Sequence, residues 1–498
     1  MTEVIAAFGL VFEPYVIAVI LAAAVFGLFV GAIPGLTATM ATALLVPVTF
    51  FMPPVPAIAC IVTATAMAIF SGDIPGALLR IPGTPASAAY VDEAYAMTKK
   101  GHAETALGAG LVFSVIGGIF GTVVLVTAAP ALAEVAVRFS SFEYFWLVLL
   151  GLTCAVFISF GDPLKGVVSL LAGLLISSIG LDNPAGHPRF TFGSIELLGS
   201  VGLIPMMIGM FAVSEILRYA VTANGGGDRV TRQIGNVFRG MWTLTKRYWA
   251  SIARGSALGT AIGALPGAGA DIAAWISYAM SKKFSKEPQK FGSGHVEGLI
   301  ESGAANNSAL AGAWIPALVF GIPGDSITAI VIGVLYIKGM NPGPTIFMNN
   351  PEQIYAVFLV FFLANLLMIP LGWACIKAAK RILEVPRNVL MPIILLFCIV
   401  GAFAINNTVF AVGVILVFGV AAYFMEENGY PVAPAILGMI LGTMLEEHFI
   451  TSMIKSDGRF LGFFERPIAA ALGIVTILVW LWPLAQWLRS RRRAAAAA

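Results

Sequence analysis

Residues 27–35 read GLFVGAIPG, an apolar stretch that ends in a proline–glycine pair. No Asp, Glu, Lys or Arg occurs around it between Glu13 and Asp73. A helix needs about 20 apolar residues to cross a bilayer, so this run is long enough for more than two crossings. Proline removes a backbone donor and glycine permits unusual dihedral angles, so the pair should interrupt a helix. The stretch therefore predicts a membrane protein with a broken helix.

The composition of the whole chain agrees with this prediction. Of 498 residues, 59% are hydrophobic and 11% are charged, and the mean hydropathy is +0.91. A soluble protein of this length carries roughly 25% charged residues. Two further charge-free runs lie between Glu104 and Glu134 and between Arg387 and Glu426. We expect an all-α polytopic membrane protein with about a dozen membrane segments, some of them discontinuous or re-entrant.

Several other classes of protein find no support in the sequence. The first basic residue is Arg80, so no positively charged leader is expected at the N-terminus. The four cysteines are isolated in apolar stretches and form no CxxC pair. A net charge of +3 does not suggest nucleic-acid binding. There is no ATP-binding P-loop motif and no HExxH motif, so we expect no enzymatic activity, no metal site and no cofactor besides a coupling ion, Na⁺ or H⁺.

The interrupted stretch has a counterpart in the second half of the chain. Residues 259–267 read GTAIGALPG and align with residues 27–35 at an offset of 232 residues, which relates Pro34 to Pro266. Residues 74–83 read IPGALLRIPG, and residues 315–324 read IPALVFGIPG, at an offset of 241 residues. The polar segment KKFSKE at 282–287 fits the difference between the offsets.

Matched helix interruptions indicate a transporter binding site. Backbone groups freed at membrane depth persist only where they line a cavity or are buried in protein. Paired interruptions in the two halves of a membrane protein point to the substrate site of a transporter. The alternative is that the Pro-Gly pairs form sharp turns at the membrane surface.

A basic stretch divides the two halves. We expect four regions: a first membrane repeat at 1–219, a cytoplasmic or interfacial linker at 220–250, a second membrane repeat at 251–488 and a cytoplasmic tail at 489–498. Aromatic residues alternate with basic ones in the linker, which suits an interfacial helix as well as a solvated basic loop. The N-terminal end carries only acidic charges and is expected to face outward. The two repeats would then be inverted, as in alternating-access transporters.

Small and hydroxyl residues follow each break and are candidates for binding a carboxylate substrate. Small residues let backbone N–H groups approach a ligand, and a helix that begins there points its positive end at it. For Thr and Ser the alternative is helix capping. The candidate substrate-binding residues are Gly35, Thr37, Thr39, Arg80, Pro82, Gly83, Thr84, Pro85, Ser87, Gly267, Ala268, Gly269, Gly324, Asp325 and Ser326.

Charged and amide residues near the breaks are candidates for ionic contacts. Arg80 pairs either with a substrate carboxylate or with Asp73. Asp271 and Asp325 bind a coupling cation or cap a helix. Asn306 and Asn307 coordinate Na⁺, hydrogen-bond substrate, or pack between helices.

The chain resembles the large membrane subunit of the tripartite tricarboxylate transporter family, the TctA type. The resemblance rests on residues 31–50, 80–101, 180–197, 263–286, 304–329, 339–347 and 428–442, and so spans nearly the whole chain. It implies a transporter of small carboxylates such as citrate, driven by an ion gradient in a bacterial inner membrane. It also implies two partners, a small TctB-type membrane subunit and a periplasmic TctC-type binding protein. Arg80 and Ala411 depart from the residues expected in the family.

Two other functions compete with that of a transporter subunit. A channel-like anion pore is compatible with re-entrant Pro-Gly segments. An intramembrane enzyme has little support, because the GxGD match at 225–228 lies in the polar linker.

Overall fold

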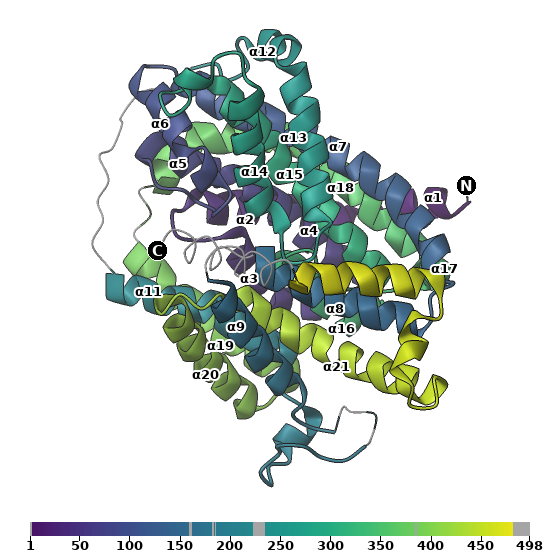
Figure 1. Ribbon diagram of the computed structural model, residues 1–498. Helices are drawn as coiled ribbons and strands as arrows, with labels where there is room; N and C mark the ends of the chain where they lie inside the picture. The colour runs from purple at the N-terminus through teal and green to yellow at the C-terminus, as the bar shows by residue number, and fades with distance from the viewer. Residues whose placement is uncertain are drawn as a thin grey trace, which may run out of the picture. The chain divides into compact units, whose positions relative to one another are not determined.

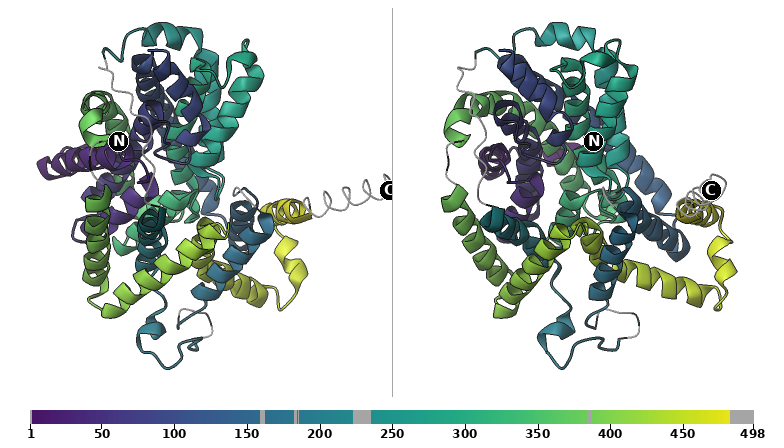
Figure 2. Two further views of the ribbon diagram at one scale, coloured as in Figure 1. Left: turned by 90° about the vertical axis from the view of Figure 1, so that its left-hand side faces the viewer. Right: turned by 60° about the vertical axis from the view of Figure 1, so that its left-hand side comes forward.

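The computed structural model describes residues 2–158, 162–181, 184, 186–222, 235–383, 385 and 387–481. Within these residues the regular secondary structure is helical, apart from one isolated β-bridge between Gly180 and Arg189. Figures 1 and 2 show these helices from three sides. The predicted all-α class is therefore confirmed. The predicted tail at 489–498 and linker residues 223–234 lie outside the described residues.

The helices are distributed over both halves of the chain. The first half contains α1 (Thr2–Val11), α2 (Pro14–Ala32), α3 (Ala38–Phe50), α4 (Pro54–Ser71), α5 (Asp73–Leu79), η1 (Ser87–Ala89), α6 (Val91–Lys99), α7 (Ala103–Ala136), α8 (Ser141–Ile158), α9 (Pro163–Ser177), η2 (Glu196–Gly199), α10 (Leu203–Ile208), η3 (Gly209–Val213) and α11 (Ser214–Thr222). The second half contains α12 (Met241–Arg247), α13 (Trp249–Gly263), α14 (Gly269–Phe284), η4 (Pro288–Lys290), α15 (Val296–Phe320), α16 (Ser326–Ile337), α17 (Ile346–Asn349), α18 (Pro351–Leu383), α19 (Arg387–Asn406), α20 (Val409–Glu427), α21 (Val432–Lys455), η5 (Phe460–Phe464) and a final helix, Pro467–Leu481.

Eight spans in the described part of the chain are long and apolar enough to cross a membrane. Five shorter apolar helices accompany them, among them α3 and α16, which begin directly after Pro-Gly breaks. Since a full crossing needs about 20 residues, helices of this shorter length suit partial crossings. The protein is therefore a polytopic membrane protein.

The helices form two compact units, and each unit draws on both halves of the sequence. Unit 1 comprises Met1–Glu134 and Gly202–Asn428, and it contains all four Pro-Gly pairs. Within it, α2 packs against α4, and α13 and α14 pack against α15 (Figure 1). Unit 2 comprises Val135–Val201 and Gly429–Ala498, where α21 packs against α8 and α9. The division of the chain at residues 220–250 into two repeats stays a prediction.

Candidate functional site

Each Pro-Gly pair lies where a helix has ended. The pairs follow α2, α5, α13 and α15, respectively: Pro34-Gly35, Pro82-Gly83, Pro266-Gly267 and Pro323-Gly324. Gly35 and Gly267 hold equivalent positions in the repeated stretch, and both have positive φ angles, 88° and 80°. This left-handed conformation is one that glycine adopts readily and other residues rarely do. The glycines therefore allow the chain to turn between two helices at the same point in each half.

In the first half, the helix before the break lies in direct backbone contact with its neighbour. A methyl group added to Gly27 of α2 would lie 2.2 Å from the carbonyl oxygen of Ala64 in α4. One added to Gly31 would lie 2.3 Å from the carbonyl oxygen of Ala68. Only glycine permits so close an approach, which is the way small residues act at helix interfaces in membranes.

The second half repeats this contact. A methyl group added to Gly259 of α13 would lie 2.3 Å from the carbonyl oxygen of Ala305 in α15. One added to Gly263 would lie 2.2 Å from the carbonyl oxygen of Ala309. The glycines follow their first-half counterparts by 232 residues and the alanines follow theirs by 241, the two offsets of the sequence motifs.

The later break in each half lies against the end of the helix that precedes the earlier break. A methyl group added to Gly83 would lie 2.9 Å from the carbonyl oxygen of Gly31, and one added to Gly324 would lie 2.5 Å from that of Gly263. Both pairs of residues are again related by the two motif offsets. In each half, therefore, two breaks that are distant in sequence lie together at the end of a tightly packed helix pair.

The hydroxyl residues after the breaks cap turns and helices. The hydroxyl of Thr37 accepts the backbone N–H of Met40 at 3.1 Å and caps α3. Thr84 and Ser87 bond one another reciprocally, since each side-chain oxygen accepts the other's backbone N–H, at 3.1 and 3.2 Å. The capping alternative is thus confirmed for Thr37, whereas Thr84 and Ser87 stabilise a turn and cap no helix. Capping is compatible with ligand binding, which stays a prediction.

The candidate substrate residues differ in how far solvent reaches them. Pro82 and Pro85 are exposed. Those that are partly exposed are Gly35, Thr37, Thr39, Gly267, Asp325 and Ser326. Those that are buried are Gly83, Thr84, Ser87, Ala268, Gly269 and Gly324. The first two groups thus lie at least partly on the surface of the chain.

Two acidic residues connect breaks to one another. The Asp325 carboxylate caps α16, where its Oδ1 accepts the Thr328 N–H at 2.8 Å. Asp271 is exposed on the first turn of α14, and α14 packs against η1 in the loop after the second break. A methyl group added to Gly269 would lie 2.7 Å from Cβ of Asp325. The second, third and fourth breaks are therefore neighbours, while a cation-binding role for either aspartate stays a prediction.

Arg80 does not pair with Asp73. Its Nε lies 2.8 Å from Oδ1 of Asp92, and both side chains are mostly exposed, at 62% and 59%. The predicted ion pair with Asp73 is wrong because Asp73 is buried, whereas Arg80 ends α5 in a left-handed conformation and reaches toward α6. A substrate role for Arg80 stays a prediction.

Asp73 instead belongs to a buried chain of polar groups. Tyr90 donates its hydroxyl to Oδ1 of Asp73 at 2.7 Å, and the Asn306 amide donates to the same hydroxyl at 3.2 Å. The neighbouring Asn307 amide contacts the sulfur of Met368 at 3.7 Å. Within the described residues, the side-chain carbonyl oxygens of Asn306 and Asn307 and Oδ2 of Asp73 have no hydrogen-bond partner.

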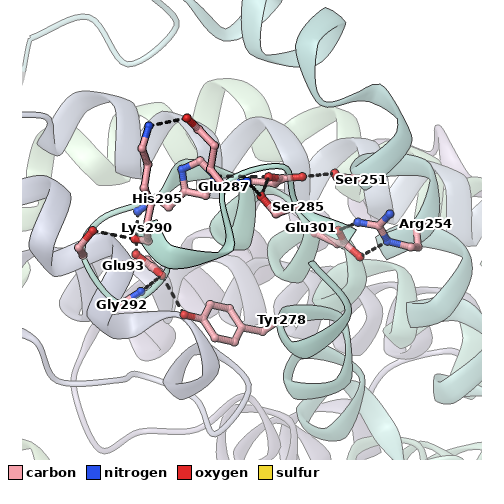
Figure 3. Close-up of polar contacts among 12 residues, drawn as sticks. Glu93, Ser251, Arg254, Tyr278, Ser285, Glu287, Lys290, Gly292, His295 and Glu301 are labelled. Atoms are coloured by element: carbon pink, nitrogen blue, oxygen red, sulfur yellow. Dashed lines mark hydrogen bonds and ion pairs between the residues drawn. The ribbon is translucent and has the colours of Figure 1, made fainter. Parts of the chain in front are cut away.

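A second polar network, around Glu93, was not foreseen from the sequence (Figure 3). Glu93 of α6 is fully buried. Its carboxylate accepts the Tyr278 hydroxyl at 2.8 Å and the backbone N–H groups of Gly292, Gly294 and His295, the last two at 2.6 and 2.7 Å. The segment before α15 thus wraps around a carboxylate of the first half. Glu93 does not stand out in sequence, because it lies in a polar stretch beside Asp92.

The same network continues into α13 and α15 (Figure 3). Glu297 accepts hydroxyls from Ser251 at 2.9 Å and Ser285 at 2.5 Å. On the surface of this segment, a hydrogen bond from Lys290 holds the pKa of Glu287 below its usual value. The loop at 285–295 is therefore hydrogen-bonded to α6 and to α15, and α15 is in turn bonded to α13.

Comparison with known proteins places this architecture in a family. Residues 17–437 match the tripartite tricarboxylate transporter TctA family. Two similar proteins come from Agrobacterium vitis. The "Uncharacterized 52.8 kDa protein in TAR-I ttuC' 3'region" is 33% identical over 94% of this chain and 92% of its own length. The "Uncharacterized protein in TAR-II ttuC' 3'region" is 35% identical over 47% of this chain and 97% of its own length.

No solved structure matches the chain. The family match covers far more than half of the chain, including all four breaks and the helices that pack around them. The protein belongs to the tripartite tricarboxylate transporter TctA family.

Proposed function

We propose that this protein is the large transmembrane subunit of a secondary transporter that imports small carboxylates, tricarboxylates or dicarboxylates. An ion gradient of Na⁺ or H⁺ drives the import. A TctC-type periplasmic protein delivers the substrate, and a TctB-type small membrane subunit completes the complex in a bacterial inner membrane. Family membership supports each of these assignments.

One observation carries the proposal beyond family membership. Two helix pairs, α2 with α4 and α13 with α15, make matched glycine–alanine contacts and end in matched Pro-Gly breaks. Paired, interrupted helices in two halves of a chain are typical of secondary transporters. We infer that the halves are inverted repeats and that their four breaks converge near the bilayer midplane.

The substrate carboxylates bind at the accessible parts of these breaks. Thr37, Thr39, Gly267 and Ser326 are partly exposed and lie at or near the starts of α3, α14 and α16. Helix starts favour anions through their free N–H groups and dipoles. Asp271, Asn306, Asn307 and Asp325 supply oxygen atoms for the coupling ion, and Arg80 pairs with a substrate carboxylate.

Reconstitution with both partner subunits tests the proposal. Proteoliposomes receive radiolabelled citrate as the probe, with and without the binding protein and with an inward Na⁺ or proton gradient. Accumulation that requires both a gradient and the binding protein is the expected result. Citrate flux that never exceeds equilibrium and needs no binding protein would indicate a channel instead.

A further inference from the structure

The carboxylate of Asp73 is buried, and only one of its two oxygen atoms accepts a hydrogen bond. Asp73 begins α5 inside the apolar span Pro54–Leu79, and it is 7% exposed. Its Oδ1 accepts one hydrogen bond, from Tyr90 at 2.7 Å. Its Oδ2 is buried without a partner and faces α7 at Gly110, where an added methyl group would lie 3.1 Å away.

The charged groups on the helices that pack around Asp73 are engaged elsewhere. Arg80 pairs with Asp92, Glu93 holds the 292–295 segment, and Lys99 lies over the Tyr95 ring. Glu104 of α7 and Lys377 of α18 both bond the backbone of Gly235. No charged residue occurs in α2 or α4. On α15, Glu301 pairs with Arg254 and Glu297 accepts the Ser251 hydroxyl, while Asp271 of α14 interacts electrostatically with Tyr90. Within the described residues, Tyr90 is the titratable group that hydrogen-bonds Asp73.

A buried carboxylate in these surroundings requires neutralisation. An ionised group in an apolar interior is costly unless it is paired and fully hydrogen-bonded. A metal cation requires several ligands, and within the described residues Asp73 belongs to no group of three or more His, Cys, Asp or Glu side chains that could hold one. A proton requires no further ligand and gives Oδ2 a hydroxyl.

We infer that Asp73 is a proton-binding site that is protonated in the state described here and exchanges its proton during transport. The inference rests on the proposed function and assigns a residue to its ion coupling. Through Tyr90 the site contacts Asn306, so the protonation state of a first-half aspartate acts on α15 of the second half. Asn306 lies one residue from Ala305 and three from Ala309, at which α13 packs on α15. Proton binding at Asp73 is thereby connected, through Tyr90 and Asn306, to α13 and α15, the helices that precede the third and fourth breaks.

Infrared difference spectroscopy of the purified protein tests this without any substrate. Wild type should show the carbonyl band of a protonated carboxyl that fades as pH rises, and Asp73→Asn should lack it. Asp457→Asn is the matched control, because Asp457 is exposed and its φ of 50° suits asparagine. A titrating band that persists unchanged in Asp73→Asn would overturn the inference, as would the absence of such a band from wild type.

Tyr90→Phe keeps the test decisive if Asp73→Asn does not fold. Phenylalanine removes the one donor that stabilises the ionised carboxylate, so the midpoint of the titration should move to higher pH. A merely structural role for Tyr90 would not move it. An unchanged midpoint in folded Tyr90→Phe would therefore overturn the inference.

Proton movement links the site to transport. In the citrate proteoliposomes, an internal pH dye should report proton influx with wild type, while Asp73→Asn should retain citrate exchange and lose that influx. Citrate uptake by wild type without proton influx would overturn this inference and leave the proposed function intact. A wild type that moves no citrate would contradict the proposed function for that substrate, and the spectroscopic titration would still decide the role of Asp73.

Discussion

Arg254 donates two hydrogen bonds to Glu301: Nε lies 2.7 Å from Oε1 and Nη2 lies 2.5 Å from Oε2. Glu301 is fully buried on α15, and the Arg254 guanidinium, from α13, also lies over the Phe284 ring at 5.0 Å. The pair therefore joins α13, α14 and α15, the three helices that precede or follow the third break (Figure 3).

Removal of Arg254 should destabilise the protein strongly. Arg254→Ala leaves a buried carboxylate without its partner, which costs about 3–5 kcal/mol. Thermal unfolding in detergent should show a clear loss, and the double variant Arg254→Ala, Glu301→Ala should lose less than the sum of the single variants. Arg247→Ala is the matched control, since Arg247 is exposed and lies over the Tyr248 ring, a contact that contributes only about 0.5–1 kcal/mol. Equal losses in Arg254→Ala and Arg247→Ala would contradict the prediction.

Loss of the Glu93 carboxylate should release the segment before α15. Glu93→Ala leaves the Tyr278 hydroxyl and three backbone N–H groups without their acceptor, at roughly 1–3 kcal/mol for each buried donor. Trypsin should then cleave after Lys286 and Lys290 at least about tenfold faster, because 1.4 kcal/mol corresponds to a factor of ten. Asp92→Ala, next in sequence and exposed, should change cleavage little. Cleavage of Glu93→Ala at the wild-type rate would show that the segment is held by other contacts.

The close helix contacts should not tolerate a methyl group. Gly31→Ala and Gly263→Ala place a carbon atom 2.3 and 2.2 Å from the carbonyl oxygens of Ala68 and Ala309, so the helices must separate. Overpacking of this kind costs about 1–3 kcal/mol. Gly303→Ala on α15 is the control, since a methyl group there meets nothing within 4 Å and alanine favours the helix by about 0.5–1 kcal/mol. If Gly31→Ala and Gly263→Ala are as thermally stable as Gly303→Ala, the close helix contacts do not limit stability and the prediction is wrong.

Arg80 should affect uptake without affecting stability. Its ion pair with Asp92 is exposed on both sides, and such pairs contribute about 0–1 kcal/mol. Arg80→Asn removes the charge and suits the left-handed backbone at this position, φ 60°. If the guanidinium binds substrate, a contact worth about 1.5–3 kcal/mol is lost and citrate affinity falls roughly ten- to a hundredfold. Asp92→Asn controls for the ion pair, and unchanged affinity in Arg80→Asn would exclude the substrate role.

The helical segments and the breaks could be predicted from sequence because they depend on local chemistry. Apolar runs of sufficient length form membrane helices, and Pro-Gly pairs end them wherever they occur. The charge at Asp73 was also visible, since it ends the first long run without charged residues. The hydrogen-bond partner of Asp73 could not be predicted. Arg80 and Tyr90 are both close to it in sequence, and only the burial of the carboxylate decides between them.

The contacts of Glu93 could not be predicted for a different reason. Its partners follow it by 185 to 202 residues and are mostly backbone N–H groups, which every residue carries. No residue type at 292–295 signals that a carboxylate will bind there. The pairing of Glu301 with Arg254, at a separation of 47 residues, requires knowledge of which faces of α13 and α15 meet.

The Glu93 contacts also impose an order on biosynthesis. Glu93 leaves the ribosome long before His295, whose N–H follows it by 202 residues. Until that segment arrives, α6 has a carboxylate without the donors that surround it in the finished protein, and such a group stays hydrated rather than buried. A chain that ends before residue 292 lacks three of the four donors to Glu93, so its α6 cannot bury this carboxylate as the complete protein does.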